Sequence, residues 1–157
     1  MNTAKMKAAV YYQYGSPDVI SITEIEKPTP KDGEVLIQIR AVSVNAYDWH
    51  LLRAKPFFTR ALSGLFKPKN SILGADIAGI VVAVGSGVSK NKVGDEVFGC
   101  LESCGKGGLA VGGFAEYVCV KESVLASKSP ALSFEEAAAL PMASVTALQG
   151  LKQAGVS

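Results

Sequence analysis

The chain has 157 residues, of which 48% are hydrophobic and 19% charged, and its formal net charge is +2. These values are ordinary for a soluble globular protein that is large enough for one hydrophobic core. No block of Lys and Arg stands out, so nucleic acid and membranes are not expected as partners. No apolar run is long enough to span a membrane and no secretory signal is evident, which predicts a cytoplasmic location.

Most of the first 125 residues are predicted to form short strands. Runs rich in β-branched and aromatic residues alternate there with Gly, Pro and Asp turn signals. The clearest strand is 34–44, in which Val35, Ile37 and Ile39 point to one side, the period of two expected of a half-buried strand. The strands are predicted at residues 7–12, 19–26, 34–44, 78–84, 93–98 and 114–120.

The other segments are predicted to be helices or loops. Residues 47–55 favour a short helix or turn, whereas 57–70, with unevenly spaced apolar residues and many cations, favours a covering loop. Ser133 and Glu136 have the spacing of a capping box, which predicts the beginning of a helix. Pro141 fits the first turn of a second helix. The apolar residues on one side of that second helix are Val145, Leu148 and Leu151.

Five segments occur in an order and spacing that resemble a known family: SVNAYDWHLLRA, LGADIAGIVVAVG, VGDEVFG, GGFAEYV and EEAAALPMASVTALQGL. Together they resemble the medium-chain dehydrogenase/reductase superfamily, specifically its zinc-free quinone oxidoreductase-like branch. The resemblance implies a mainly β fold with short helices. It places a GroES-like, partly open β-barrel at residues 1–130. Two linker helices at 131–157 would normally lead into a Rossmann domain, which is expected to be absent here.

The resemblance implies the N-terminal catalytic domain of an NAD(P)H-dependent, zinc-independent oxidoreductase. Such an enzyme transfers hydride to quinones or α,β-unsaturated carbonyls, so its partner is a small-molecule carbonyl or quinone. NADP or NAD would be bound mostly by the absent domain, so this chain alone is expected to be inactive. The exposed linker helices are expected to promote self-association, and a homodimer is a candidate assembly. Two alternatives stay open: a stand-alone GroES-like binding or assembly module, and a fragment of a zinc-containing alcohol dehydrogenase.

The candidate site residues come from an Asn-x-x-Asp pattern, which in the zinc-free branch lines the cleft beside the nicotinamide. Asn45, Tyr47 and Asp48 are the catalytic candidates: Asn45 and Tyr47 as hydrogen-bonding groups, and Asp48 as an acid that fixes the loop through backbone amides. Asn45 and Thr146 are the cofactor-binding candidates. Tyr47 also has a plain interpretation as a packing aromatic, and Thr146 as a helix residue bonded to the preceding turn. His50 is a weaker candidate, as a proton relay.

No metal site is expected. In zinc-containing relatives a Cys ligand stands at the position of Asn45, and a His-Glu pair at 75–76, where Ala75 cannot coordinate metal. The structural zinc lobe of those relatives needs four closely spaced cysteines. The cysteines of this chain are Cys100, Cys104 and Cys119. They are interpreted as small apolar residues in a reducing compartment.

Two glycine-rich runs match phosphate-binding turns only in part. Residues 85–87, Gly-Ser-Gly, follow a strand but lack a third glycine and a following helix, so a strand-to-strand turn is predicted. Residues 105–108 contain one Lys but no following Ser or Thr, which favours a flexible loop.

One acid, Asp76, stands at the beginning of a run that otherwise has the character of a buried strand. An isolated carboxylate is costly to bury, so it needs a partner. Because Ala75 removes the metal site, Asp76 is interpreted as a remnant acid, held by nearby amides or by a cation such as Arg53. It would face the cleft without taking part in the chemistry.

Overall fold

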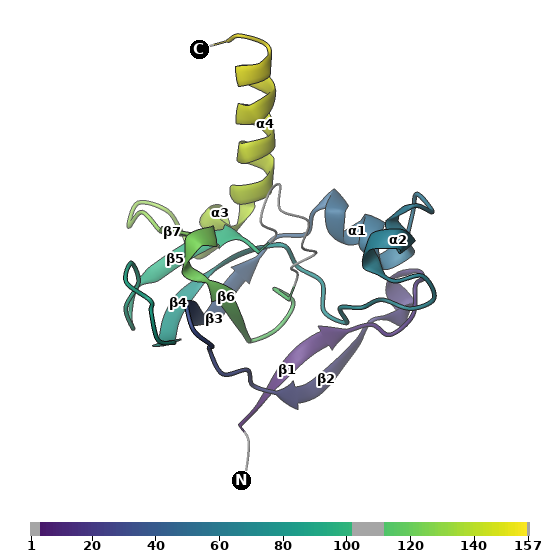
Figure 1. Cartoon of the computed structure of the whole chain (residues 1–157), viewed down its shortest axis with the longest axis horizontal. Helices are drawn as coiled ribbons and strands as arrows, with labels where there is room; N and C mark the ends of the chain where they lie inside the picture. Colours follow the sequence, from purple (N-terminus) through teal and green to yellow (C-terminus); the bar gives the residue numbers. More distant parts are fainter. Residues whose placement is uncertain (1–3, 102–111, 157) are drawn as a thin grey trace.

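The computed structural model describes residues 4–101 and 112–156 and contains two antiparallel sheets (Figure 1). Strands β1 (Lys5–Val10) and β2 (Ser21–Glu26) form a hairpin. A second sheet has five strands in the order β6-β3-β4-β5-β7. Their bounds are β3 Glu34–Val42, β4 Asp76–Val84, β5 Glu96–Cys100, β6 Tyr117–Lys121 and β7 Leu125–Ser127.

Isolated bridges join the hairpin to the rest of the chain. Ala8 pairs with Ala115 and Val10 with Ile72, and no continuous ladder closes the two sheets among the described residues. The barrel is therefore partly open, which confirms the predicted fold class.

All six predicted strands begin and end within a few residues of the observed ones, and the differences have local causes. The strand predicted from residue 93 begins at Glu96, because Gly94 adopts φ +96° in the turn before it. The strand predicted from residue 114 begins at Tyr117, because Ala115 bridges to β1 instead. Strand β7 was not predicted, since its three residues are too few to show a period.

The main hydrophobic core lies against the five-stranded sheet. It consists of Val35, Ile37, Ile77, Val81, Val97, Leu101 and Val120. A second cluster consists of Tyr11, Leu51, Leu52 and Leu73. It joins the segment just after the hairpin strand β1 to the part of the chain that holds the two short helices, called the helical lobe below. A third consists of small side chains, Ala78, Ala137 and Ala138, where a C-terminal helix packs on β4.

The lobe contains two helices, α1 (Ala46–Arg53) and α2 (Thr59–Ser63), beside two short 3-10 turns elsewhere in the chain, Pro17–Val19 and Glu122–Val124. The predicted helix at 47–55 is confirmed by α1. The prediction of a loop throughout 57–70 is wrong, because α2 forms there. That helix spans little more than one turn, and Ser63 Oγ donates to the carbonyl of Thr59, a local bond that apolar periodicity does not reveal.

The C-terminal helices are α3 (Phe134–Ala139) and α4 (Pro141–Gln153). The predicted capping box is confirmed: Ser133 Oγ accepts from the N–H of Glu136, and Glu136 Oε2 accepts from the N–H of Ser133. Pro141 is the first residue of α4 and its one buried residue, so the rest of the helix stands away from the sheets (Figure 1). Within the described residues, no helix is long and apolar enough to cross a membrane.

Candidate functional site

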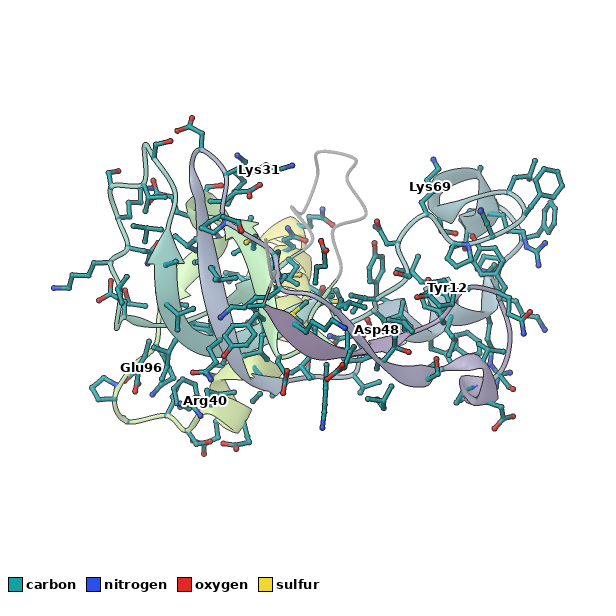
Figure 2. All side chains as sticks on the ribbon, turned by 90° about the horizontal axis from the view of Figure 1, so that it is seen from below. Tyr12, Lys31, Arg40, Asp48, Lys69 and Glu96 are labelled. Carbon is teal, nitrogen blue, oxygen red and sulfur yellow. The ribbon has the colours of Figure 1, made fainter. Side chains whose placement is uncertain are left out.

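At the N-terminus of α1 the side chain of Asp48 reaches back to the backbone of the N-cap residue Asn45. Asp48 Oδ2 accepts a hydrogen bond of 2.8 Å from the backbone N–H of Asn45. Asp48 Oδ1 accepts another of 2.8 Å from the N–H of Gly74, which lies just before β4. Figure 2 shows Asp48 between the sheet and the helical lobe. Its carboxylate therefore ties α1 to the entrance of β4 through backbone amides.

Burial controls the acidity of Asp48, which is 2% exposed. Desolvation raises the pKa of its carboxyl above the ordinary value of 3.8. The N–H groups of Asn45 and Gly74 lower that pKa, and the nearby Asp76 raises it, by smaller amounts. Folding therefore favours the protonated form of this group. Its contribution to stability is complete below the unfolded pKa and is lost as the pH rises through the folded one.

We expect Asp48→Asn to destabilise the chain by about 1–3 kcal/mol, because an amide oxygen cannot replace both carboxylate acceptors. The loss of stability should be larger at about pH 4 than at about pH 7. The raised pKa of Asp48 stabilises the wild type at low pH, this stabilisation is lost as the pH rises, and the variant lacks it. Urea unfolding of both proteins across that range measures it. A deficit that grows with pH would contradict a raised pKa for Asp48.

The side chain of Asn45 has both of its N–H groups engaged. Its Nδ2 donates to Ser43 Oγ at 3.0 Å and to Asp76 Oδ2 at 3.2 Å. The expectation that Asn45 offers a hydrogen-bond donor to a ligand therefore changes, because the polar atom that stays available is the acceptor Oδ1.

Asp76 is fully buried at the beginning of β4. Its Oδ2 accepts a second hydrogen bond, of 2.9 Å, from the backbone N–H of Met142 in the first turn of α4. The expectation that amides hold Asp76 is thus confirmed. Arg53 is not its partner: no ion pair with Asp76 occurs in the described chain, and the Arg53 guanidinium lies 5.4 Å from the ring centre of Trp49.

The other candidates lie at different depths. Tyr47 is half-buried and packs against the Tyr11–Leu73 cluster of the lobe. His50 Nδ1 lies 2.7 Å from the carbonyl oxygen of Lys55, a contact within the lobe. Thr146 is exposed on α4, and its Oγ1 donates to the carbonyl of Met142 at 2.7 Å. Thr146 therefore makes the bond to the preceding turn that its plain interpretation predicted.

Hydrogen bonds join the two cofactor-binding candidates. Asn45 and Met142 both donate to the same oxygen of Asp76, and Thr146 donates to Met142. Asp76 is thus the residue that brings α1, β4 and α4 together. The sequence did not predict that Asp76 connects these elements. The signal that pointed to it was an acid at the mouth of an apolar strand.

The glycine-rich run at residues 85–87 forms a turn between strands. Residues 85–87 connect β4 to the turn before β5, which confirms a strand-to-strand turn. A Cβ on Gly85 would lie 1.8 Å from the carbonyl oxygen of Lys31, so the backbone of this turn is packed against its own domain. The run at 105–108 lies outside the described residues.

In the described parts of the chain, no group of three or more His, Cys, Asp or Glu side chains is arranged to hold a metal ion. Ala75 is fully buried. Burial also raises the pKa of the Cys119 thiol to about 11, which keeps it protonated at neutral pH, whereas metal binding requires the thiolate. Cys104 lies outside the described residues.

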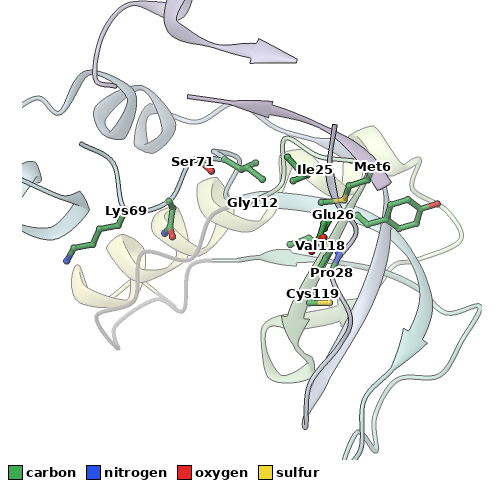
Figure 3. Close-up of a pocket in the computed structure, with 12 residues that line it drawn as sticks. Met6, Ile25, Glu26, Pro28, Lys69, Ser71, Gly112, Val118 and Cys119 are labelled. Carbon is green, nitrogen blue, oxygen red and sulfur yellow. The ribbon is translucent and has the colours of Figure 1, made fainter. Parts of the chain in front are cut away.

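A shallow hollow of about 390 Å³ lies between the hairpin and β6 (Figure 3). Met6, Ile25 and Val118 give it apolar walls, and Lys69 lies at its rim. None of Asn45, Tyr47, Asp48 and Thr146 lines it. It is therefore a separate feature from the candidate site at the beginning of α1 and α4.

The chain belongs to the alcohol dehydrogenase GroES-like domain family, whose model matches residues 31–130. Within the medium-chain dehydrogenase/reductase superfamily, its relatives include proteins named as quinone oxidoreductases and as reductases of a furanone and of alkenals.

Particular relatives match over nearly the whole chain. It is 43% identical to the 2-methylene-furan-3-one reductase of Solanum lycopersicum, over 98% of this chain and 39% of that protein. It is 39% identical to the chloroplastic NADPH-dependent alkenal/one oxidoreductase of Arabidopsis thaliana, over 94% of this chain and 37% of that protein. The quinone oxidoreductase of Coxiella burnetii has a TM-score of 0.83 and 32% identity, over 98% of this chain and 46% of that one.

The chain thus spans less than half the length of these relatives. The location of this protein stays a prediction.

Proposed function

We propose that this chain is the substrate-side part of an NAD(P)H-dependent, zinc-independent reductase of quinones or α,β-unsaturated carbonyls. The observation that carries the proposal is the identity of 43% and 39% with relatives named as a furanone reductase and an alkenal/one oxidoreductase, over nearly the whole chain. The name of the second relative includes NADPH, which supports NADP as the cofactor.

The residues present fit one end of such a cofactor. The cofactor, when bound, supplies the hydride. The turn at Gly85 is packed against its own domain and cannot cradle the pyrophosphate, so other residues would have to bind the phosphates. Asn45 and Thr146, joined through Asp76 and Met142, would hold the nicotinamide end against the substrate.

The chemistry assigned to this chain is orientation and hydrogen bonding. Asn45 Oδ1 would accept a hydrogen bond from a hydroxyl or an amide N–H of the ligand, since its own N–H groups are engaged. Tyr47 is the proposed donor to the substrate oxygen, where negative charge develops after hydride transfer. Asp48 would keep the loop that carries both residues in place through its two backbone hydrogen bonds.

Zinc independence rests on the donor set. A methyl group occupies position 75, and the amide of Asn45 is engaged with Ser43 and Asp76. The amide nitrogen of a neutral asparagine is not a zinc ligand, and the protonated thiol of Cys119 is a poor one.

The test is oxidation of NADPH by the polypeptide that carries this chain, with an α,β-unsaturated ketone and a quinone as acceptors, before and after treatment with EDTA. We expect turnover that chelation does not change and less than about 0.1 zinc per chain by mass spectrometry. The 157-residue chain alone should show no turnover and no micromolar NADPH binding by calorimetry. Loss of turnover on chelation would identify a zinc enzyme. No turnover with either acceptor would favour a binding or assembly module.

A further inference from the structure

The buried carboxylate of Asp76 lies at the junction of the sheet, the lobe and α4. We propose that Asp76 is a positioning residue of the candidate site: it sets which way the amide of Asn45 faces and couples that orientation to the first turn of α4. Four observations carry this inference: the polarity of the contact with Asn45, the sharing of one oxygen with Met142, the burial, and the lack of a paired cation among the described residues.

The polarity of the contact follows from chemistry. Asn45 Nδ2 donates to Asp76 Oδ2 at 3.2 Å, so the part of the Asn45 amide that faces Asp76 is its NH2 group. The second N–H is directed at Ser43 Oγ. A ligand atom that contacts the Asn45 amide must therefore be a donor, such as a hydroxyl or an amide N–H. A carbonyl oxygen would meet Oδ1, a second acceptor.

The coupling to α4 follows from a shared oxygen. Asp76 Oδ2 accepts from Asn45 and also from the N–H of Met142. A negative charge at the N-terminus of a 13-residue helix is electrostatically favourable. Pro141 is the one buried residue of α4, and this bond next to it is a direct tie between the helix and β4. A change in the direction of α4 would move Met142 and, through Asp76, the amide of Asn45.

The burial of Asp76 argues against a packing role. The residue is fully buried, no cation is paired with it in the described chain, and its Oδ1 has no hydrogen-bond partner there. Such a carboxylate is expensive, and an apolar residue of similar volume would pack without that penalty. The two N–H groups that it orients account for a carboxylate at this position.

The experiment is hydrogen exchange of the ¹⁵N-labelled 157-residue chain by NMR, read at the side-chain NH2 of Asn45 and the backbone N–H of Met142. In Asp76→Leu both signals should exchange at least about tenfold faster than in the wild type, while the amides shared by β3 and β4 stay protected. In Asp76→Asn the chemical shifts of both signals should change, but both groups should stay protected from exchange, because the amide oxygen of the new side chain still accepts their hydrogen bonds. Asp18→Asn, which changes an exposed carboxylate, is the matched control and should leave both signals unchanged.

A second variant keeps the inference testable if Asp76→Leu does not fold. Ser43→Ala should speed exchange at the Asn45 NH2 while the N–H of Met142 stays protected. Ser43 Oγ accepts a hydrogen bond from Asn45 and makes none with Met142. The inference is overturned if Asn45 exchanges as fast as an exposed amide in the wild type. It is also overturned if Asn45 keeps wild-type exchange in a folded Asp76→Leu chain, or if Asp76→Asn loses protection at both signals.

The identification of Asn45 as a ligand contact rests on the proposed function, whereas the hydrogen bonds of Asp76 do not. Failure of the exchange experiment would remove the positioning role and leave the reductase proposal standing. Absence of NADPH turnover would remove the reductase proposal and leave the exchange result unchanged.

Discussion

Gly74→Ala is expected to destabilise the chain by about 3 kcal/mol or more, through backbone strain and a steric clash together. Gly74 has φ +96°, a conformation that L side chains rarely adopt. A Cβ there would lie 2.7 Å from the backbone nitrogen of Phe114 and 2.9 Å from the carbonyl carbon of Gly113, so the backbone would have to move. Because Gly74 also donates to Asp48, that movement would loosen the N-terminus of α1. Urea unfolding measures the loss.

Gly94 provides a matched control for that substitution. It has the same φ of +96°, but a Cβ there would meet nothing within 4 Å. Gly94→Ala should therefore show the conformational strain alone, about 1–2 kcal/mol. The difference between the two substitutions isolates the clash with residues 113 and 114. Equal losses at both positions would show that the close approach at Gly74 has no energetic weight.

The chain is expected to self-associate through α4, and the double substitution Leu148→Glu with Leu151→Glu should make it monomeric. Val145, Leu148 and Leu151 are 39%, 52% and 51% exposed, and they lie on one side of a helix that stands away from the sheets (Figure 1). Burying such a stripe against a second copy removes apolar surface from water. Sedimentation velocity over a range of about 10–200 μM protein distinguishes the two states.

The control for this experiment keeps the change in charge and moves it around the helix. Ala143→Glu with Gln153→Glu also adds two negative charges to exposed positions of α4, on the side away from the apolar stripe. That variant should self-associate as the wild type does. A wild-type chain that sediments as a clean monomer throughout would contradict the expectation.

The elements that sequence predicted well are those with strong local chemistry. The Ser133–Glu136 capping box and Pro141 define the beginnings of α3 and α4 because each involves residues at most three apart. Strand β3 was predicted from its alternation. Helix α2 and strand β7 were missed because five and three residues carry too little pattern. The family resemblance supplied the barrel, which no local pattern contains.

The sequence predicted the residues of the candidate site, but it did not predict the hydrogen bonds that join them. Asp48 lies three residues from Asn45, so its capping role could be anticipated. The bond between Asp76 and Met142 joins residues 66 apart in the chain, and the bond between Asp76 and Asn45 joins residues 31 apart. Such contacts depend on how β4 is placed between α1 and α4, which periodicity and spacing do not encode. Asp76 was therefore recognised as unusual before its partners were known.

The shortness of β7 has a consequence for how the sheet ends. An edge strand presents unpaired N–H and C=O groups that can recruit a strand of another molecule. Strand β7 is an edge of the five-stranded sheet, but it has three residues, all paired inward with β5. Directly after it, Lys128 turns to Glu96 and to the carbonyl of Leu132, which takes the chain away from the sheet. This edge offers too short a template for amyloid-like stacking.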